Sequence, residues 1–257
     1  MLDGLAEHAD GILGRQDFGV DPGRFQALLL GGDGIALAAE GGPADVVDQA
    51  EFATLLPASG DDYLRVQRLG DGVTRLHLDL HVADPWAAAE AAEAAGAELV
   101  DDSRHSHVVL RTPGGVVFCF VTRPAATLPP LAVWPDGQGS RLAQVCWDVP
   151  RARFSAEAAF WQAILAGEWT PPDAGEAITR KAGELALDLR LQPAEIAREV
   201  VGHLHQVTDD RSAEVARLTA AGSITRSVRE TQTMLETPGG VPLCVLDQQR
   251  GGIACRA

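Results

Sequence analysis

The chain reads VVLRTPGGVVFCFV at residues 108–121 and, 125 positions later, TMLETPGGVPLCVL at residues 233–246. The same offset aligns EFATLLPASGDDYLRVQR (51–68) with EAITRKAGELALDLRLQP (176–193). Solenoid repeats are much shorter, at about 20–50 residues. So long a period indicates a duplicated domain, and the sequence therefore consists of two copies of one design.

The clearest strand of each copy carries a histidine at a matched place. In RLHLDLHV (75–82) the odd positions are polar and the even positions are apolar. This period of two predicts a strand with one face on a core and the other toward water or a pocket. HLDLHVAD (77–84) matches HLHQVTDD (203–210) at an offset of 126. His77 and His203 are therefore equivalent in the two copies.

Helix and turn signals complete the pattern of each copy. An aspartate followed by a proline marks a helix start at Asp21 and at Asp84. Glycine pairs predict hairpin turns, which need positive φ, at residues 114–115 and 239–240. The sequence predicts helices over residues 21–32, 84–98, 154–167 and 209–222. The order strand, helix, strand, turn, strand predicts an α+β fold with helices on one face of mostly antiparallel strands.

A segment rich in proline and glycine separates the two copies. LPPLAVWPDGQG (128–139) contains three prolines and two glycines, which is typical of a linker. We therefore expect a first domain over residues 1–127, with a degenerate N-terminal module, and a second domain over residues 140–257.

Composition narrows the class of protein. The net charge of the 257-residue chain is −15, and Lys181 is its only lysine. Nucleic-acid binding needs basic surface, so neither nucleic acid nor an anionic membrane is an expected partner. No apolar run reaches the ~18 residues of a membrane span, and no leader peptide is visible. Four cysteines without CxxC spacing indicate buried, reduced thiols and a cytoplasmic protein.

The pattern resembles the vicinal oxygen chelate superfamily, which includes glyoxalase I-like, bleomycin-resistance and extradiol dioxygenase proteins. The resemblance covers residues 51–247 well and residues 1–50 poorly. It implies four βαβββ modules forming two glyoxalase-like domains, each a curled, mostly antiparallel sheet that makes a cup, with helices outside. In that superfamily a divalent metal is held by a His or Gln on the first strand and a Glu on the last strand of each module. The stretches that carry the resemblance are HLDLHVADP, AQVCWDVPRARFSAEAAFW, AEVARLTAAG and the two TPGGxxxCxV hairpins.

Carried over position by position, the resemblance gives a set of candidate ligand-binding side chains without a carboxylate. They are Gln67, His77, Cys119, Gln144, Gln192, His203 and Cys244. The corresponding place of the first module falls near Asp17 to Val20. Without a carboxylate a hard metal ion loses both its charge balance and a catalytic base. We therefore expect no metal and no cofactor; a metal, if bound, would use His77, Gln144 and His203.

Several candidate residues have two interpretations. Cys119 and Cys244 lie in apolar strands and suit a core, but a Cys–His pair in each cup could also be nucleophilic. His77 and His203 suit a pocket wall as well as a ligand role. Asp79 and His205, two residues further along, could form a polar floor or pair with arginines across strands.

Three functions remain open on the sequence. The first hypothesis is a metal-free cup that binds a small organic molecule, as in resistance or sequestration proteins. The alternative is a metal-dependent lyase, isomerase or dioxygenase. The third is a structural or interaction protein whose cups are filled by side chains. Two modules complete a cup, so either a monomer or a homodimer would serve, and no nucleotide motif is present.

Overall fold

A computed structural model gives the fold. It describes strands at residues 25–31, 46–49, 52–55 and 64–68, and the segments 74–101, 107–122, 131–165, 167–172, 176–180, 187–195 and 197–248. By its contacts the chain divides into two compact units, each built from both halves of the sequence. Unit 1 is Met1–Gln26, His77–Ala126 and Trp147–Val201; unit 2 is Ala27–Leu76, Thr127–Cys146 and Gly202–Ala257. The domain boundaries expected at residues 127 and 140 stay a prediction.

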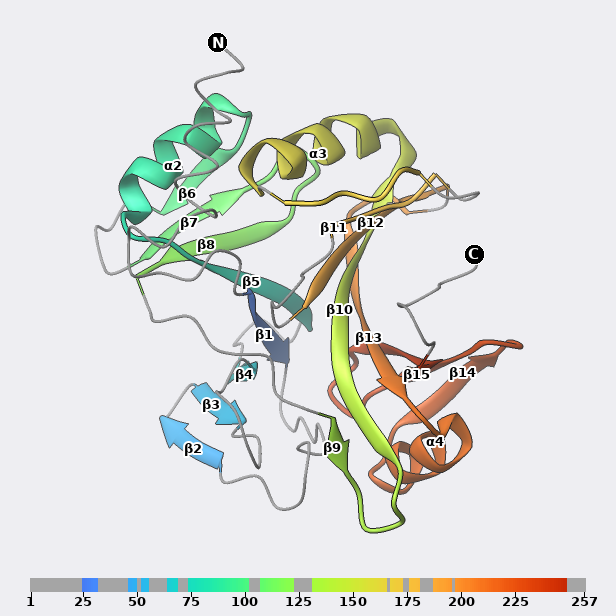
Figure 1. The fold of residues 1–257 in the computed structure, drawn as a ribbon. Coiled ribbons are helices and arrows are strands. Elements are labelled where there is room, and N and C mark those ends of the chain that lie inside the picture. The colour runs from blue at the N-terminus through green and yellow to red at the C-terminus, as the bar shows by residue number, and fades with distance from the viewer. Residues whose placement is uncertain are drawn as a thin grey trace. The chain divides into compact units, whose positions relative to one another are not determined.

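The duplication extends to the bounds of single elements. Strand β5 (Arg75–His81) and helix α2 (Pro85–Ala94) have counterparts in β13 (Val201–Thr208) and α4 (Arg211–Ala220), each beginning 126 residues later. The predicted alternating strand and the capped helix that follows it are thus confirmed in both copies (Figure 1).

The predicted hairpins are also duplicated. Strands β7 (His107–Arg111) and β8 (Val117–Val121) begin 125 residues before β15 (Gln232–Glu236) and β16 (Pro242–Asp247). The offset between the two copies changes from 126 to 125 residues after the edge strands. These strands, β6 (Glu98–Asp101) and β14 (Ile224–Val228), still begin 126 residues apart. In each of the two predicted glycine pairs, only the second glycine has a positive φ. The values are +105° for Gly115 and +80° for Gly240.

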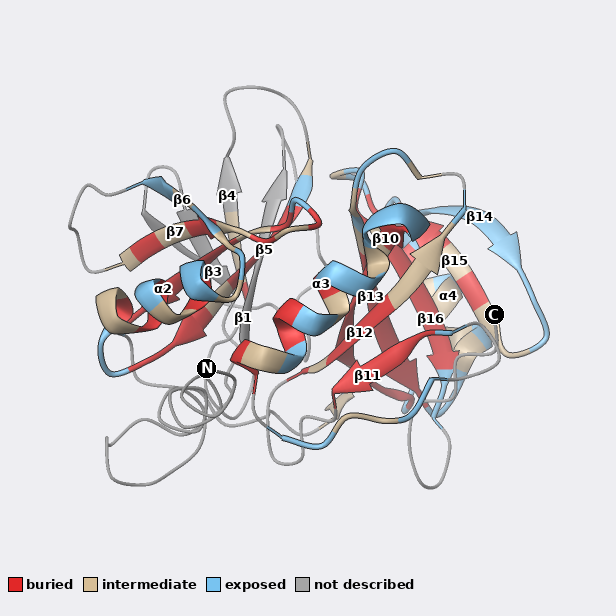
Figure 2. Ribbon diagram, turned by 90° about the horizontal axis from the view of Figure 1, so that it is seen from above, coloured by how far each residue is buried: buried red, intermediate tan, exposed pale blue. Residues whose placement is uncertain are grey.

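Unit 1 contains the strand order β5-β8-β7-β6, with β8 parallel to β5 and antiparallel to β7. Helix α2 packs on β7 and β8. Helix α3 (Arg151–Ile164) contacts α2 and β12 (Asp188–Ala194), which pairs with β11 (Ile178–Arg180). Figure 2 shows α3 buried on one side and exposed on the other. This pattern is that of an amphipathic helix lying on a core.

The core of unit 1 is aromatic. The ring centroid of Phe118, on β8, lies 5.9 Å from Phe160 and 5.5 Å from Trp161, both on α3. All three side chains are buried. Burial of such rings is a large source of hydrophobic stabilisation, so Phe160 and Trp161 anchor α3 in the core of unit 1.

Unit 2 contains the order β13-β16-β15-β14, with β13 parallel to β16 and the remaining pairs antiparallel. It also holds the order β2-β3-β4-β1, made of β2 (Val46–Gln49), β3 (Phe52–Leu55), β4 (Leu64–Arg68) and β1 (Phe25–Gly31). The first strand of a module runs parallel to its last strand in three places: β1 pairs with β4, β5 with β8, and β13 with β16.

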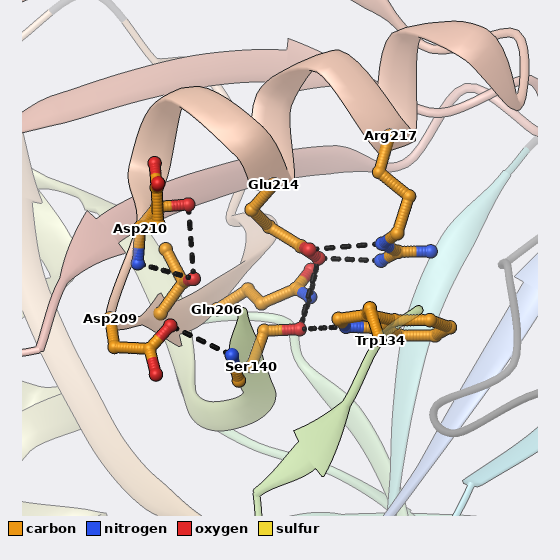
Figure 3. Close-up of polar contacts among 9 residues, drawn as sticks. Trp134, Ser140, Gln206, Asp209, Asp210, Glu214 and Arg217 are labelled. Carbon is orange, nitrogen blue, oxygen red and sulfur yellow. Dashed lines mark hydrogen bonds and ion pairs between the residues drawn. The ribbon is translucent and has the colours of Figure 1, made fainter. Parts of the chain in front are cut away.

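A buried carboxylate ties α4 to the strands of unit 2 (Figure 3). Glu214 accepts hydrogen bonds from Ser140 Oγ at 3.0 Å and Gln206 Nε2 at 2.5 Å, and pairs with Arg217. The Arg217 guanidinium lies 3.5 Å over the Trp134 ring. Because each of these polar groups is partnered, the network is a structural anchor.

The helix predicted over residues 21–32 is wrong, because residues 25–31 form β1. This strand pairs in parallel with β4, from Ala27 opposite Leu64 to Gly31 opposite Arg68. A short apolar run such as FQALLLG fits a buried strand as well as a helix, and tertiary pairing decides between them. Residues 21–24, with the expected Asp21 cap, lie outside the described part of the chain.

The predicted linker is partly structured. Within residues 128–139, β9 (Ala132–Val133) pairs with the start of β10 (Gly139–Pro150), where Gly139 lies opposite Val133. Pro135 and Gly137, between these two strands, therefore lie in a hairpin turn within unit 2. No helix among the described residues is long and apolar enough to cross a membrane.

Candidate functional site

The first polar cluster lies in unit 1, on the face shared by β5 and β8. The two strands pair with Asp79 opposite Cys119, so both side chains point to one face. His77 Nε2 lies 3.1 Å from Cys119 Sγ and 3.3 Å from Asp79 Oδ1. The predicted Cys–His contact is therefore present here, and Asp79, expected on a polar floor or paired with an arginine, lies beside His77.

The surroundings of Cys119 favour its neutral thiol over the thiolate. Its burial, and then the negative charges of Asp79 and Asp101, raise the pKa of Cys119 far above its usual range. A protonated sulfur is a poor nucleophile. The nucleophilic interpretation of this Cys–His pair thus loses support, and the core interpretation gains it.

The second polar cluster lies in unit 2, on the matched strand β13 and its neighbour β10. His205 Nδ1 is 2.6 Å from Gln144 Oε1, and the two Nε2 atoms of His203 and His205 are 2.9 Å apart. Donor atoms of Cys146, His203 and His205 all lie within 4.8 Å of one another, and all three residues are buried. The structure thus brings the candidates Gln144 and His203 together through His205.

The other candidates lie in different surroundings. Cys244 packs with Val207 and Leu246 in an apolar cluster. Gln192 donates to Asp148 Oδ1. Gln67 lies on β4 opposite Phe52, and its side chain is outside the described residues. A role of these residues in ligand binding stays a prediction.

A separate pocket of about 730 Å³ opens beside α3 in unit 1. This volume is within the range of about 300–1,000 Å³ that is usual for small-molecule sites. None of the seven candidates lines it. The lining residues are Arg151, Phe154, Ser155, Ala158, Gln162, Trp169, Thr170, Pro171, Pro172, Glu176 and Ile178.

The pocket combines a fixed apolar wall with a charged rim. Thr170 N donates to Thr179 O at 2.8 Å, which holds the segment of Trp169 and the two prolines against β11. At the rim, Arg151 pairs with Glu176 at 2.6 Å and with Glu195. Glu176 has φ +62°, a left-handed conformation that is uncommon outside glycine. Residues held in this way concentrate at binding and active sites.

Two groups of residues at these sites are not among the candidates predicted from the sequence. Cys146 follows Gln144 by two positions on one strand, so the period of two could have placed both on one face. The pocket wall carries a weaker signal, the tryptophan and two prolines of WTPP (169–172). Its other wall, on α3, is brought near only by tertiary folding.

Comparison with known proteins agrees with this architecture. The family model of the glyoxalase-like domain matches the chain twice, at residues 23–121 and 144–246. The chain therefore belongs to the glyoxalase-like domain family and, with it, to the vicinal oxygen chelate superfamily. No curated protein matches the chain significantly.

Solved structures share the fold at low sequence identity. The Mn(II)-bound glyoxalase from Novosphingobium aromaticivorans has a TM-score of 0.62 and 14% identity, over 87% of this chain and 81% of that one. A catechol 2,3-dioxygenase has a TM-score of 0.55 and 15% identity, over 90% and 89%. An extradiol ring-cleaving dioxygenase from B. fuscum has a TM-score of 0.54 and 14% identity, over 87% and 70%. These likenesses concern the fold alone.

The residues at the superfamily's ligand places do not fit a hard divalent ion. The resemblance puts Cys119 and Cys244 at the places where the superfamily keeps glutamate; burial and nearby carboxylates raise the pKa of Cys119, and Cys244 packs among apolar side chains. Ions such as Mn²⁺ prefer carboxylate and other oxygen ligands. A function that depends on such an ion therefore lacks its usual ligands in this chain.

Proposed function

We propose that this glyoxalase-like protein binds a small organic molecule in the pocket beside α3. The observation that carries the proposal is the pocket itself, with about 730 Å³ between α3 and the segment at residues 169–178. Phe154, Trp169 and Ile178 supply apolar contact area, and Ser155, Gln162 and Thr170 supply hydrogen-bonding groups. Small-molecule sites have this composition, a mostly apolar cleft with a few polar anchors.

The rim of the pocket favours a ligand with a positive charge or several hydrogen-bond donors. Arg151 is shared between the carboxylates of Glu176 and Glu195, so these three groups leave one net negative charge. Aromatic rings attract cations through their faces, and Trp169 and Phe154 are both available. The ligand class that fits is a flat organic molecule bearing an amine or a similar donor group.

The other two functions have less support. A metal-dependent lyase, isomerase or dioxygenase needs donor chemistry that the superfamily's ligand places lack here. The buried contacts of His77 with Cys119 and of His205 with Gln144 suit cups filled by their own side chains. Such filling is compatible with ligand binding at a pocket elsewhere in the fold.

Thermal-shift screening of the purified protein against amines of aromatic character tests this function. A ligand at about 100 times its Kd adds about 2.7 kcal/mol to the free energy of unfolding. We expect Trp169→Ala to weaken such a ligand about tenfold or more, which is about 1.4 kcal/mol of lost contact.

Trp86→Ala is the matched control, since Trp86 is a half-buried tryptophan on α2 in the same unit and does not line the pocket. It should leave the affinity unchanged. A hit that binds Trp169→Ala as tightly as the wild type would place the ligand outside this pocket. No hit in a broad library of such amines would count against the binding function.

A further inference from the structure

The strongest unassigned chemistry in the molecule is the cluster of Cys146, His203 and His205. Cys146 lies on β10, and the two histidines follow the same face of β13 because they are two residues apart. Their exposed fractions are 0%, 6% and 2%. One sulfur and two imidazoles therefore converge in a region closed to bulk water.

The partner of His205 sets the direction of its ring. Gln144 Oε1 can only accept a hydrogen bond, so His205 Nδ1, at 2.6 Å, carries the proton and donates. In neutral His205 the other nitrogen, Nε2, then holds a lone pair, and it faces His203 Nε2 at 2.9 Å. Histidines that ligate metals are commonly oriented in this way, by donating their second N–H to an oxygen.

From this geometry we propose that Cys146, His203 and His205 bind a transition-metal ion of intermediate softness, for which Zn²⁺ is the best match. A thiolate with two imidazoles is a donor set that zinc accepts, and a water or small ligand can take the fourth position. Tetrahedral zinc separates its ligand atoms by about 3.3–3.6 Å. The three donor atoms already lie within 4.8 Å of one another, so small side-chain rotations make the site.

Metal binding changes which atoms of His203 and Cys146 carry protons. Without an ion, His203 Nε2–H donates to His205 Nε2 and satisfies both buried nitrogens. With an ion, the lone pairs of both Nε2 atoms bind the metal, His203 takes its other tautomer, and the Cys146 thiol releases its proton to solvent. The ion would fasten β10 to β13 within unit 2.

The first half of the chain provides an internal contrast. There the counterparts of His203 and His205 are His77 and Asp79, and the nearby sulfur is Cys119. A carboxylate thus takes the place of the second imidazole in the first half. We therefore assign the site of one sulfur and two imidazoles to the second half alone.

Titration of chelator-treated protein with Co²⁺, a spectroscopic substitute for Zn²⁺, tests the proposal. We expect about one equivalent to bind, with a thiolate-to-cobalt charge-transfer band and the visible bands of a tetrahedral site, and we expect Zn²⁺ to abolish both. Absence of the charge-transfer band, or binding of less than about a tenth of an equivalent, overturns the proposal.

Variants locate the ion. Cys146→Ser should remove the charge-transfer band, whereas Cys244→Ser and Cys119→Ser, which alter the other two described buried cysteines, should keep it. Gln144→Ala, at a positioning residue, should keep the band and weaken affinity about 10–100-fold. Loss of the band in Cys244→Ser or Cys119→Ser overturns the assignment. Should Cys146→Ser fail to fold by circular dichroism, Gln144→Ala decides, and an unchanged affinity then rejects the site.

Discussion

Glu157 is a fully buried carboxylate that joins α3 to the hairpin between β7 and β8. It accepts hydrogen bonds from Thr112 Oγ1 at 2.7 Å, Gly114 N at 2.5 Å and Trp161 Nε1 at 2.8 Å. Burial raises the pKa of Glu157 against the opposing effect of these three donors. A Cβ on Gly114 would lie 2.5 Å from Glu157 Oε2. The Glu157 carboxylate therefore leaves no room for a side chain at position 114, and only glycine fits this turn.

Gly114→Ala should consequently destabilise the protein by about 1–3 kcal/mol, because the added methyl group displaces a buried, hydrogen-bonded carboxylate. Urea denaturation of the wild type and the variant measures the change in the free energy of unfolding. The control is the same substitution in a Glu157→Ala background, where the methyl group meets no carboxylate. An equal cost in both backgrounds would show that Glu157 is not the cause.

At the scale of elements, two aspartates begin equivalent helices. Asp84 accepts from Trp86 N at 2.9 Å and Ala87 N at 3.1 Å, at the start of α2. Asp210 accepts from Ala213 N at 3.0 Å, at the start of α4. Each bond satisfies a backbone donor that the helix itself leaves unpaired.

We expect Asp84→Ala and Asp210→Ala each to lower the free energy of unfolding by about 1 kcal/mol. Chemical denaturation gives the two values. Asp84→Asn is the conservative control, since asparagine caps helices as well as aspartate does. A loss in Asp84→Asn as large as that in Asp84→Ala would mean that charge, and not capping, gives the effect.

These local signals explain which elements the sequence could predict. Caps and a period of two or of 3.6 act within a few residues, so α2, α4, β5 and β13 follow directly from the sequence. Strand β1 does not, because its state depends on pairing with β4, more than 30 residues later. The start of α3 is also missed, since Arg151 follows Pro150 without a side-chain cap.

The candidate site, too, has one part that the sequence predicts and another part that only tertiary folding creates. The matched positions of His77 and His203 come from the duplication and are visible in the sequence. The contact of His205 with Gln144 joins two strands 61 positions apart, and no local pattern encodes it. The pocket depends on α3 meeting residues 169–178, which also requires tertiary folding.

At the scale of the whole molecule, the duplicated design carries a large charge imbalance. The chain has 36 acidic and 21 basic residues and a net charge of −15 at pH 7. Like charges on a compact surface repel one another and destabilise the folded state. At about 10 mM salt the screening length is about 30 Å, and at about 100 mM it is about 10 Å.

Raising NaCl from about 10 mM to about 150 mM should therefore stabilise the protein, because it screens repulsion that the expanded unfolded chain relieves. Screening worth about 1 kcal/mol would raise Tm by about 2–4 °C for a chain of this size. Differential scanning calorimetry measures the shift, and choline chloride at equal ionic strength should reproduce it. A fall in Tm would mean that attractive ion pairs, such as those of Arg151 and Arg226, outweigh the net repulsion.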